Sequence, residues 1–309
     1  MPALVQDDGV IVVAGGTGFI GSAVVRALLR AGADVTVASA HPGRQTRSPG
    51  VRMVEADVQR PETLPGAFEG AEVVVQALTF PTFPVEKPRK GYTFDEFEHH
   101  GTERLVRAAE ASGARRYVYV SGAGAAADAE KVWHRAKWAG ERAVLASSMS
   151  SCVLRPSWVY GPGDRALNRF VAFARRGPAV PVIGDGQQRV QPVFVDDVGE
   201  AAALAAAPDG PAGVFEIGGP DVLTMDEVLG AVLRAIGKPS KRLVHVPAAL
   251  PKAVGAVAQV LPKPPLSPDA VDFATGDALA DMTGLLAAFP GLRLRSLDEG
   301  LAIYLRPRK

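Results

Sequence analysis

The chain has 309 residues, 47% of them hydrophobic and 22% charged, and its 34 basic against 33 acidic residues give a formal net charge of +1. This composition indicates a globular protein with a sizeable core, and the charge balance argues against a nucleic-acid-binding or membrane-surface protein. The N-terminus has no basic segment followed by an apolar one, and no stretch approaches the roughly 18 apolar residues of a membrane helix, so we expect a cytoplasmic protein.

The first half of the chain alternates strand and helix patterns. We predict strands over 10–13, 35–38, 51–55, 73–77, 117–121 and 152–155, and helices over 22–30, 94–112 and 131–147. Continuous apolar strands separated by helices predict an α/β fold with a doubly wound parallel sheet that is buried on both faces. The single cysteine, Cys152, excludes an internal disulfide, and its place in a strand favours a small buried side chain over a reactive thiol.

The character of the sequence changes after residue 161. Segments such as GPGDRALNRF and PKPPLSPD are rich in proline and glycine, and helical patterns return over 225–236 and 251–261. We therefore assign residues 1–160 to the doubly wound domain. Residues 161–309 form mainly a smaller, irregular C-terminal region, with a segment of about 190–215 that returns to the first domain's core.

Three glycines follow the first predicted strand. Gly15, Gly18 and Gly21 lie in the sequence GGTGFIG, between a strand and a helix. This spacing predicts a tight turn, a close approach of the backbone to a pyrophosphate and close helix–strand packing, with the anion at the helix N-terminus. The alternative is a glycine-rich turn that serves packing alone.

From this turn onward the chain resembles the short-chain dehydrogenase/reductase superfamily, in its extended and atypical branch. The blocks GGTGFIG, GTERLVRAAEASGARRYVYVSG, LRPSWVYGPGD and PVFVDDVGEA carry the resemblance over nearly the whole chain. The most similar subgroup contains the accessory NAD(P)-binding subunit of respiratory complex I and its bacterial relatives. The resemblance implies a Rossmann fold, a bound nicotinamide dinucleotide over residues 1–160, and a C-terminal substrate-binding region.

The resemblance also implies the residues that contact the cofactor. They are Gly15, Thr17, Gly18, Phe19, Ile20, Gly21, Ser39, His41, Arg44, Asp57, Val58, Ala77, Leu78, Ser121, Lys137, Pro156, Ser157 and Trp158. The second strand ends in Ser39 and Ala40, so it offers no carboxylate to a ribose hydroxyl, and we favour NADP over NAD because Ser39, His41 and Arg44 could reach a 2′-phosphate. The alternative interpretation of Arg44 is a solvated loop charge. Asp57 either borders the adenine or caps a turn.

The catalytic positions depart from the superfamily. By resemblance, Lys137 is the lysine that holds the ribose, Ser121 is the serine that polarises a carbonyl, and Glu98 stands at the asparagine position. Trp133 occupies the place of the tyrosine, the usual proton donor, and an indole N–H cannot do that work. His134 is a speculative replacement, because histidine titrates near neutrality. Tyr160 is expected near the nicotinamide.

The substrate side favours an apolar small molecule. Val190 takes the position where nucleotide-sugar enzymes carry an arginine, Arg189 is expected on the opposite strand face, and Phe80, Phe83 and Trp133 suggest an apolar pocket. The leading hypothesis is an NAD(P)-dependent oxidoreductase with an altered catalytic tetrad. The alternatives are a non-enzymatic NADP(H)-binding accessory, assembly or redox-sensing protein and, less favoured, a nucleotide-sugar epimerase or dehydratase.

We expect no metal site, and the oligomeric state stays open. His99 and His100 are adjacent on a predicted helix, so their side chains should point about 100° apart and chelate one ion poorly.

Overall fold

The computed structural model describes residues 9–42, 50–247, 249 and 276–305. The predicted helix at 251–261 lies outside these residues. The main sheet is seven-stranded, with every strand pair parallel and with the order β11-β6-β5-β4-β1-β2-β3, so the predicted doubly wound fold is confirmed. Its strands are β1 (Val10–Ala14), β2 (Val35–Ser39), β3 (Arg52–Glu55), β4 (Ala71–Gln76), β5 (Arg116–Val120), β6 (Ser150–Pro156) and β11 (Gly213–Ile217).

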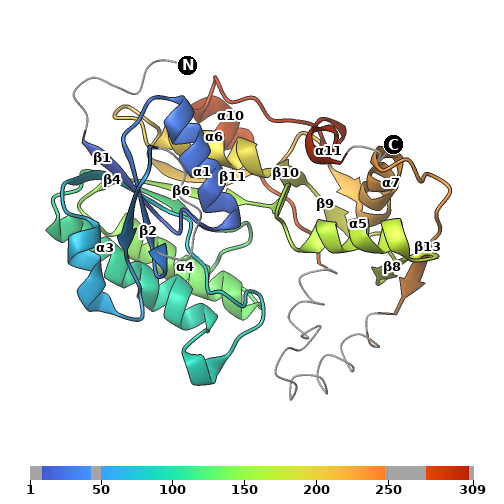
Figure 1. Cartoon of the computed structure of the whole chain (residues 1–309), viewed down its shortest axis with the longest axis horizontal. Helices are drawn as coiled ribbons and strands as arrows, with labels where there is room; N and C mark the ends of the chain where they lie inside the picture. Colours follow the sequence, from blue (N-terminus) through green and yellow to red (C-terminus); the bar gives the residue numbers. More distant parts are fainter. Residues whose placement is uncertain (1–8, 43–49, 248, 250–275, 306–309) are drawn as a thin grey trace.

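Helices cover both faces of this sheet (Figure 1). On one face α1 (Phe19–Arg30) packs against α6 (Val195–Ala205), and on the other lie α2 (Leu64–Ala67), α3 (Gly101–Ala111) and α4 (Val132–Leu145). Successive strand residues alternate between the two cores, as Val12 packs with the α3 and α4 side and Val13 with the α1 and α6 side. Cys152 is fully buried, and burial raises the pKa of its thiol to about 12, as expected of a packing residue.

The strand β11 was not predicted. It pairs in parallel with β6 at one edge of the sheet, and only Ile217 of its five residues is buried. Its sequence, GVFEI, is short, begins with glycine and contains Glu216, and we predicted no strand there, although the other edge strand, β3, was predicted. Its addition shows that the chain returns to the main sheet after residue 212.

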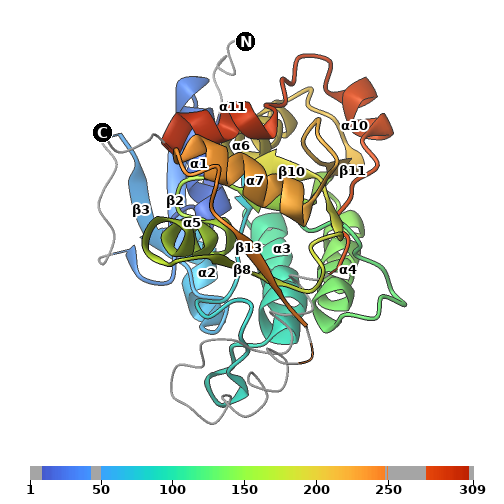
Figure 2. The ribbon, with the colours of Figure 1, turned by 90° about the vertical axis from the view of Figure 1, so that its right-hand side faces the viewer.

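The C-terminal region is built around a third hydrophobic cluster, which contains Tyr160, Leu167, Val228 and Leu301. The remaining elements are η2 (Pro61–Thr63), η3 (Pro88–Lys90), η4 (Asp95–His100), β7 (Trp158–Tyr160), α5 (Ala166–Arg176), β8 (Val180–Ile183), β9 (Arg189–Val190), β10 (Pro192–Phe194), β12 (Leu223–Thr224), α7 (Met225–Ala235), β13 (Leu243–Val246), α10 (Thr283–Ala288) and α11 (Leu297–Tyr304). Figures 1 and 2 show α11 alongside α7, with α5, β8 and β13 on the same side of the molecule.

The order of the strands indicates where a ligand binds. From β1 the chain moves to β2 and β3 on one side and then returns to β4, β5 and β6 on the other. The carboxyl ends of β1 and β4 therefore lie at the point where the winding reverses, and open α/β sheets bind ligands in the crevice at this point. Those two strands end at Ala14 and Gln76.

Candidate functional site

The turn between β1 and α1 requires glycine at two positions. Gly15 has a φ of +81°, and a Cβ added there would lie 2.7 Å from the carbonyl oxygen of Ala77, just beyond β4. A Cβ on Gly21 would lie 2.1 Å from the carbonyl oxygen of Gly15, so this residue sets how closely α1 approaches the turn. Both contacts match the steric roles that the sequence predicted for these glycines.

The N-terminus of α1 has the character of an anion site. Its N-cap residue is Gly18, no side chain caps the helix, and the first turn holds no acidic residue. The amide groups that open the helix, together with the helix dipole, favour a phosphate at this position. Thr17, Phe19 and Ile20 are partly exposed around it. The residues present therefore fit the pyrophosphate of a dinucleotide.

The strand ends beyond this turn carry the predicted adenosine contacts. Ser39 ends β2, and its Oγ accepts a hydrogen bond of 3.3 Å from the backbone N–H of His41, which is exposed. Asp57 accepts from the backbone N–H of Gln59 at 3.0 Å and pairs with Arg60 at 3.2 Å, so it does cap a turn. Contact of Asp57 or of the buried Val58 with an adenine stays a prediction. Arg44 lies outside the described residues.

At the end of β5, Lys137 of α4 is buried in an ion pair. Its Nζ lies 2.7 Å from Oε2 of Glu98 and donates a hydrogen bond of 3.0 Å to the carbonyl oxygen of Val120. The same atom lies 5.0 Å from the ring centroid of Tyr119, within the range of a cation–π contact. Burial, and then the nearby Glu98, raise the pKa of the Tyr119 phenol well above its ordinary value, so this tyrosine is no substitute acid.

Glu98 reaches Lys137 because of a local irregularity. The predicted helix at 94–112 begins with a π-helical turn, η4, and Glu98 is only 1% exposed on the inner side of that turn. A Cβ on Gly140 would lie 2.3 Å from the carbonyl oxygen of Glu98, so glycine at this position lets α4 pack directly against η4. The sequence placed Glu98 near the site but did not predict its ion pair with Lys137. A glycine inside an amphipathic helix, Gly140, was the one indication that α4 packs closely against this segment.

Ser121 belongs to a second buried network. Its Oγ donates a hydrogen bond of 2.5 Å to Glu141, one turn beyond Lys137 on α4. Glu141 also accepts two bonds from Arg155 of β6, at 2.9 and 2.5 Å, and these hydrogen bonds raise the pKa of the Arg155 guanidinium. Because the serine proton is directed to a carboxylate, Ser121 is not oriented to polarise a substrate carbonyl. The sequence gave no sign of this network.

Trp133 and His134 form a wall beside the end of β5. A Cβ on Gly122 would lie 2.7 Å from the indole ring of Trp133, and the ring of His134 lies 4.2 Å from that of Trp133. Burial lowers the pKa of His134 to about 4, so its imidazole is neutral at pH 7 and is a poor proton donor there.

The residues after β6 turn away toward the C-terminal region. Pro156 accepts a hydrogen bond of 2.9 Å from the backbone N–H of Ala123, and the Ser157 hydroxyl donates to the carbonyl oxygen of Gln191 at 2.5 Å. The Trp158 side chain is 7% exposed and packs in the third cluster. Tyr160 is fully buried there, with its hydroxyl 3.3 Å from the Ser296 carbonyl, so it is a packing residue rather than a group beside the nicotinamide.

The predicted pocket aromatics are only partly available. Phe80 is 1% exposed and packs edge-to-face on Phe94 with ring centroids 5.1 Å apart, so it belongs to the core and not to a pocket wall. Phe83 packs on it and is partly exposed. Arg165 of the C-terminal region donates a hydrogen bond of 3.3 Å to the carbonyl oxygen of Phe83, so the segment after β4 contacts the C-terminal region here.

The two residues of β9 lie on opposite faces of the strand, as predicted for Val190 and Arg189. Val190 is 3% exposed, whereas Arg189 faces solvent and pairs with Asp277 at 3.3 Å. The position at which the resemblance predicts an arginine in nucleotide-sugar enzymes therefore holds a buried valine.

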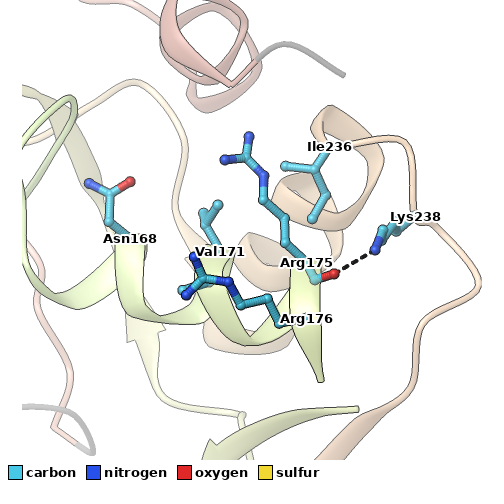
Figure 3. A pocket seen from close by; sticks show the side chains of 7 residues that line it. Asn168, Val171, Arg175, Arg176, Ile236 and Lys238 are labelled. Carbon is cyan, nitrogen blue, oxygen red and sulfur yellow. Dashed lines mark hydrogen bonds between the residues drawn. The ribbon is translucent and has the colours of Figure 1, made fainter. Parts of the chain in front are cut away.

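A separate cavity lies between α5 and the end of α7 (Figure 3). Its volume is about 410 Å³, and Arg175, Arg176 and Lys238 line it together with Asn168 and Ile236. Lys238 donates a hydrogen bond of 2.8 Å to the carbonyl oxygen of Arg175, in the last turn of α5. None of the lining residues belongs to the glycine turn or contacts Lys137, so this cavity is distinct from the candidate site.

Comparison with known proteins gives consistent matches. Residues 11–218 match the family model described as the NAD dependent epimerase/dehydratase family. The chain is 30% identical over 303 residues to the mitochondrial NADH dehydrogenase (ubiquinone) 1 alpha subcomplex subunit 9 of Arabidopsis thaliana, covering 94% of this chain and 73% of that protein. It is 32% identical over 247 residues to a ceramide reductase of Caulobacter vibrioides, covering 77% and 74% of the two chains.

Solved structures show the same fold. A UDP-glucose 4-epimerase of Thermotoga maritima superposes with a TM-score of 0.74 over 96% of this chain and 97% of its own, at 22% identity. Among the residues that the structure describes, no helix is long and apolar enough to cross a membrane.

Proposed function

The chain belongs to the NAD dependent epimerase/dehydratase family of oxidoreductases, and from this premise we propose that it transfers a hydride between a nicotinamide dinucleotide and an apolar small molecule without a catalytic tyrosine. The observation that carries the proposal is the pairing of an open glycine turn at the end of β1 with a buried lysine at the end of β5. The first is suited to a pyrophosphate and the second to a ribose hydroxyl.

The roles of the residues follow from their contacts. Gly15, Gly18 and the amide groups that open α1 hold the pyrophosphate. A bound nicotinamide supplies or accepts the hydride. A lysine ammonium has three N–H donors, and Glu98 and Val120 take two of those of Lys137, which would leave the third for a ribose hydroxyl of a bound dinucleotide.

The class of substrate follows from the two proton donors that this site lacks. Trp133 replaces the phenol, and Ser121 directs its proton to Glu141. An isolated ketone becomes an alkoxide as the hydride arrives, and it needs an acid beside it. A quinone or a conjugated enone becomes a delocalised anion, which can take its proton from water in a later step. We therefore propose that apolar quinones or conjugated enones are the substrates.

Oxidation of NADPH and NADH in the presence of matched apolar quinones, enones and saturated ketones tests this function. We expect turnover with the first two classes and little with the third. The Lys137→Ala variant should raise the KM for the dinucleotide. Binding of the dinucleotide without turnover on any of these compounds would refute hydride transfer.

The nucleotide preference is a further part of the proposal. The family model names NAD, and β2 ends in Ser39 with no carboxylate on that residue or the next two, which supports NADP. We expect Ser39→Asp to weaken binding of NADPH more than binding of NADH, because the new carboxylate would repel a 2′-phosphate. If Ser39→Asp changed the affinities for NADPH and NADH equally, Ser39 would not belong to the adenosine site.

The second candidate is a dinucleotide-binding accessory protein without turnover. The observation that favours it is the similarity to a complex I subunit over 94% of the chain. It predicts tight binding of NAD(P)H, no hydride transfer, and association with a larger assembly. That relative is named as mitochondrial, and the cytoplasmic location of this chain stays a prediction.

A further inference from the structure

Two histidines on the outer side of η4 stack against one another. The rings of His99 and His100 lie 4.2 Å apart with an angle of 25° between their planes. Both residues lie at the end of the π-helical turn η4. The two imidazoles are therefore close together, although adjacent residues of a regular α-helix point about 100° apart.

A carboxylate faces the two rings on one side. Asp95 Oδ1 lies 3.0 Å from Nδ1 of His99, and Asp95 Oδ2 lies 3.5 Å from Nε2 of His100. One ligand atom from each of these three residues lies within 4.8 Å of the other two. Asp95 is 65% exposed, so both its carboxylate and an ion from solvent have access to this side of the stack.

A second carboxylate faces the opposite ring nitrogens. Glu103 Oε1 lies 3.5 Å from Nε2 of His99, and Glu103 Oε2 lies 3.4 Å from Nδ1 of His100. Metal-binding histidines commonly donate their other N–H group to a carboxylate, which fixes the ring tautomer and orientation. Glu103 thus stands where such a supporting carboxylate is needed. Arg107 lies 3.5 Å from Glu103 and helps to hold it.

We propose that Asp95, His99 and His100 form a binding site for a divalent transition-metal ion, with Glu103 orienting both imidazoles. Two imidazoles and a carboxylate suit zinc and its neighbours better than magnesium or calcium, which prefer oxygen ligands alone. A tetrahedral zinc ion about 2.1 Å from each ligand holds the ligand atoms roughly 3.4 Å apart. To bind one ion, the two imidazoles must turn out of their nearly parallel stack until both nitrogens face it, and the exposure of all three side chains leaves room for this turn.

The proposed metal site shares its helical turn with the buried residue Glu98. Glu98, which pairs with Lys137, lies on the same turn between Asp95 and His99, but it points into the core. An ion on the outer side would fix the turn that places Glu98. The metal site does not depend on the proposed hydride transfer, and the two stand or fall separately.

Calorimetric titration of the full chain with Zn²⁺, without a histidine affinity tag, tests the proposal. We expect saturable binding of one ion by the wild type. The double variant His99→Ala with His100→Ala should bind at least about 100-fold more weakly, since even supporting partners contribute roughly 10–100-fold to metal affinity. Glu103→Gln should weaken binding by about that smaller factor.

His245→Ala is the matched control, because His245 is also partly exposed and pairs with a carboxylate, Asp226, at 2.9 Å, but has no second imidazole in that pair. It should bind Zn²⁺ as the wild type does. Thermal melts in the presence of a chelator establish that each variant is folded. Electron paramagnetic resonance with Cu²⁺ should show two nitrogen ligands in the wild type and none at this site in the double variant. Absence of one-to-one binding by the wild type, or equal binding by the double variant, overturns the proposal.

Discussion

The two ends of the candidate site are built in different ways. At the turn between β1 and α1 the geometry comes from the backbone, where glycines remove side chains so that Gly15 can approach Ala77 and α1 can approach Gly15. At the end of β5 the geometry comes from buried charged side chains, with Lys137 on Glu98 and Ser121 on Glu141. The first end is suited to binding phosphate whatever the reaction, whereas the second decides which chemistry is available.

The two ends should also differ in the kind of substitution that damages them. A buried ion pair depends on both partners, because each desolvated charge needs the other. A glycine turn depends on the absence of atoms. Substitutions should therefore affect the β5 end chiefly through charge and the β1 end through volume.

The largest effect is expected from breaking the buried ion pair. Glu98→Ala leaves the Lys137 ammonium buried without its carboxylate and should lower the free energy of unfolding by about 3–5 kcal/mol. Chemical denaturation measures this loss. The double variant Glu98→Gln with Lys137→Met removes both charges and should cost less than Glu98→Ala alone. A loss below about 1 kcal/mol for Glu98→Ala would mean that the pair is not desolvated as described.

The next effect is steric and concerns the glycine turn. Gly21→Ala places a Cβ 2.1 Å from the Gly15 carbonyl oxygen, so α1 must shift, at a cost of about 1–3 kcal/mol. Fluorescence titration should also show weakened binding of NAD(P)H, because the shift displaces the helix N-terminus. Gly66→Ala on α2 is the control, since nothing lies within 4 Å of its added Cβ; it should leave NAD(P)H binding unchanged and raise the stability by about 0.4–1 kcal/mol, because alanine favours a helix more than glycine does. Equal effects of the two substitutions would contradict the packing role of Gly21.

A smaller effect is expected at Ser121. Ser121→Ala removes one hydrogen bond to Glu141 but leaves both bonds from Arg155, so the stability should fall by about 1 kcal/mol. Because the hydroxyl proton is directed to Glu141, kcat should change less than about tenfold, below the roughly 10²–10⁴-fold contribution of a group that transfers a proton in the transition state. Steady-state kinetics on the best substrate checks this. A decrease in kcat of several hundredfold would show that Ser121 has a catalytic role.

The last effect is the pH dependence due to His134, which is absent at neutral pH and develops only in acid. Its pKa in the folded protein is about 4, below the ordinary value of 6.5, so the unfolded chain binds the proton more readily. The stability of the wild type relative to His134→Gln should therefore be constant above about pH 6.5 and fall as the pH decreases toward 4. Asp164, whose pKa burial raises to about 6, gives the opposite slope in both proteins, so it cancels in the difference. If the difference in stability between the two proteins did not change with pH, His134 would be exposed to solvent.

The sequence was a good guide to features that depend on local pattern. The first six strands of the main sheet, the glycine turn and the position of Lys137 on a helix after β5 can all be predicted from apolar runs and from glycine spacing. The strand β11 was missed, whereas β3, at the other edge of the sheet, was predicted although it has no buried residue. The distinct roles of Val190 and Arg189 were predicted, because strand alternation is a local rule.

Features that depend on contacts between distant segments were not legible. Glu141 and Arg155 are ordinary charged residues in the sequence, and only the packing of α4 on the sheet brings them to Ser121. The π-helical turn η4 and the stacking of His99 on His100 within it were not predicted from any residue pattern. Tyr160 was placed near the nicotinamide by resemblance, but α11, far along the chain, covers it.

The most direct test of the proposed function is transfer of the hydride itself. The protein would be incubated with NADPH carrying deuterium at the transferable C4 position and with an apolar quinone or enone, and the product analysed by mass spectrometry. An enone should acquire deuterium on carbon, and the Lys137→Ala variant should transfer less of it at equal dinucleotide concentration. Bound NADPH with no deuterium in any product would contradict the account and favour a protein that holds its dinucleotide without reacting it.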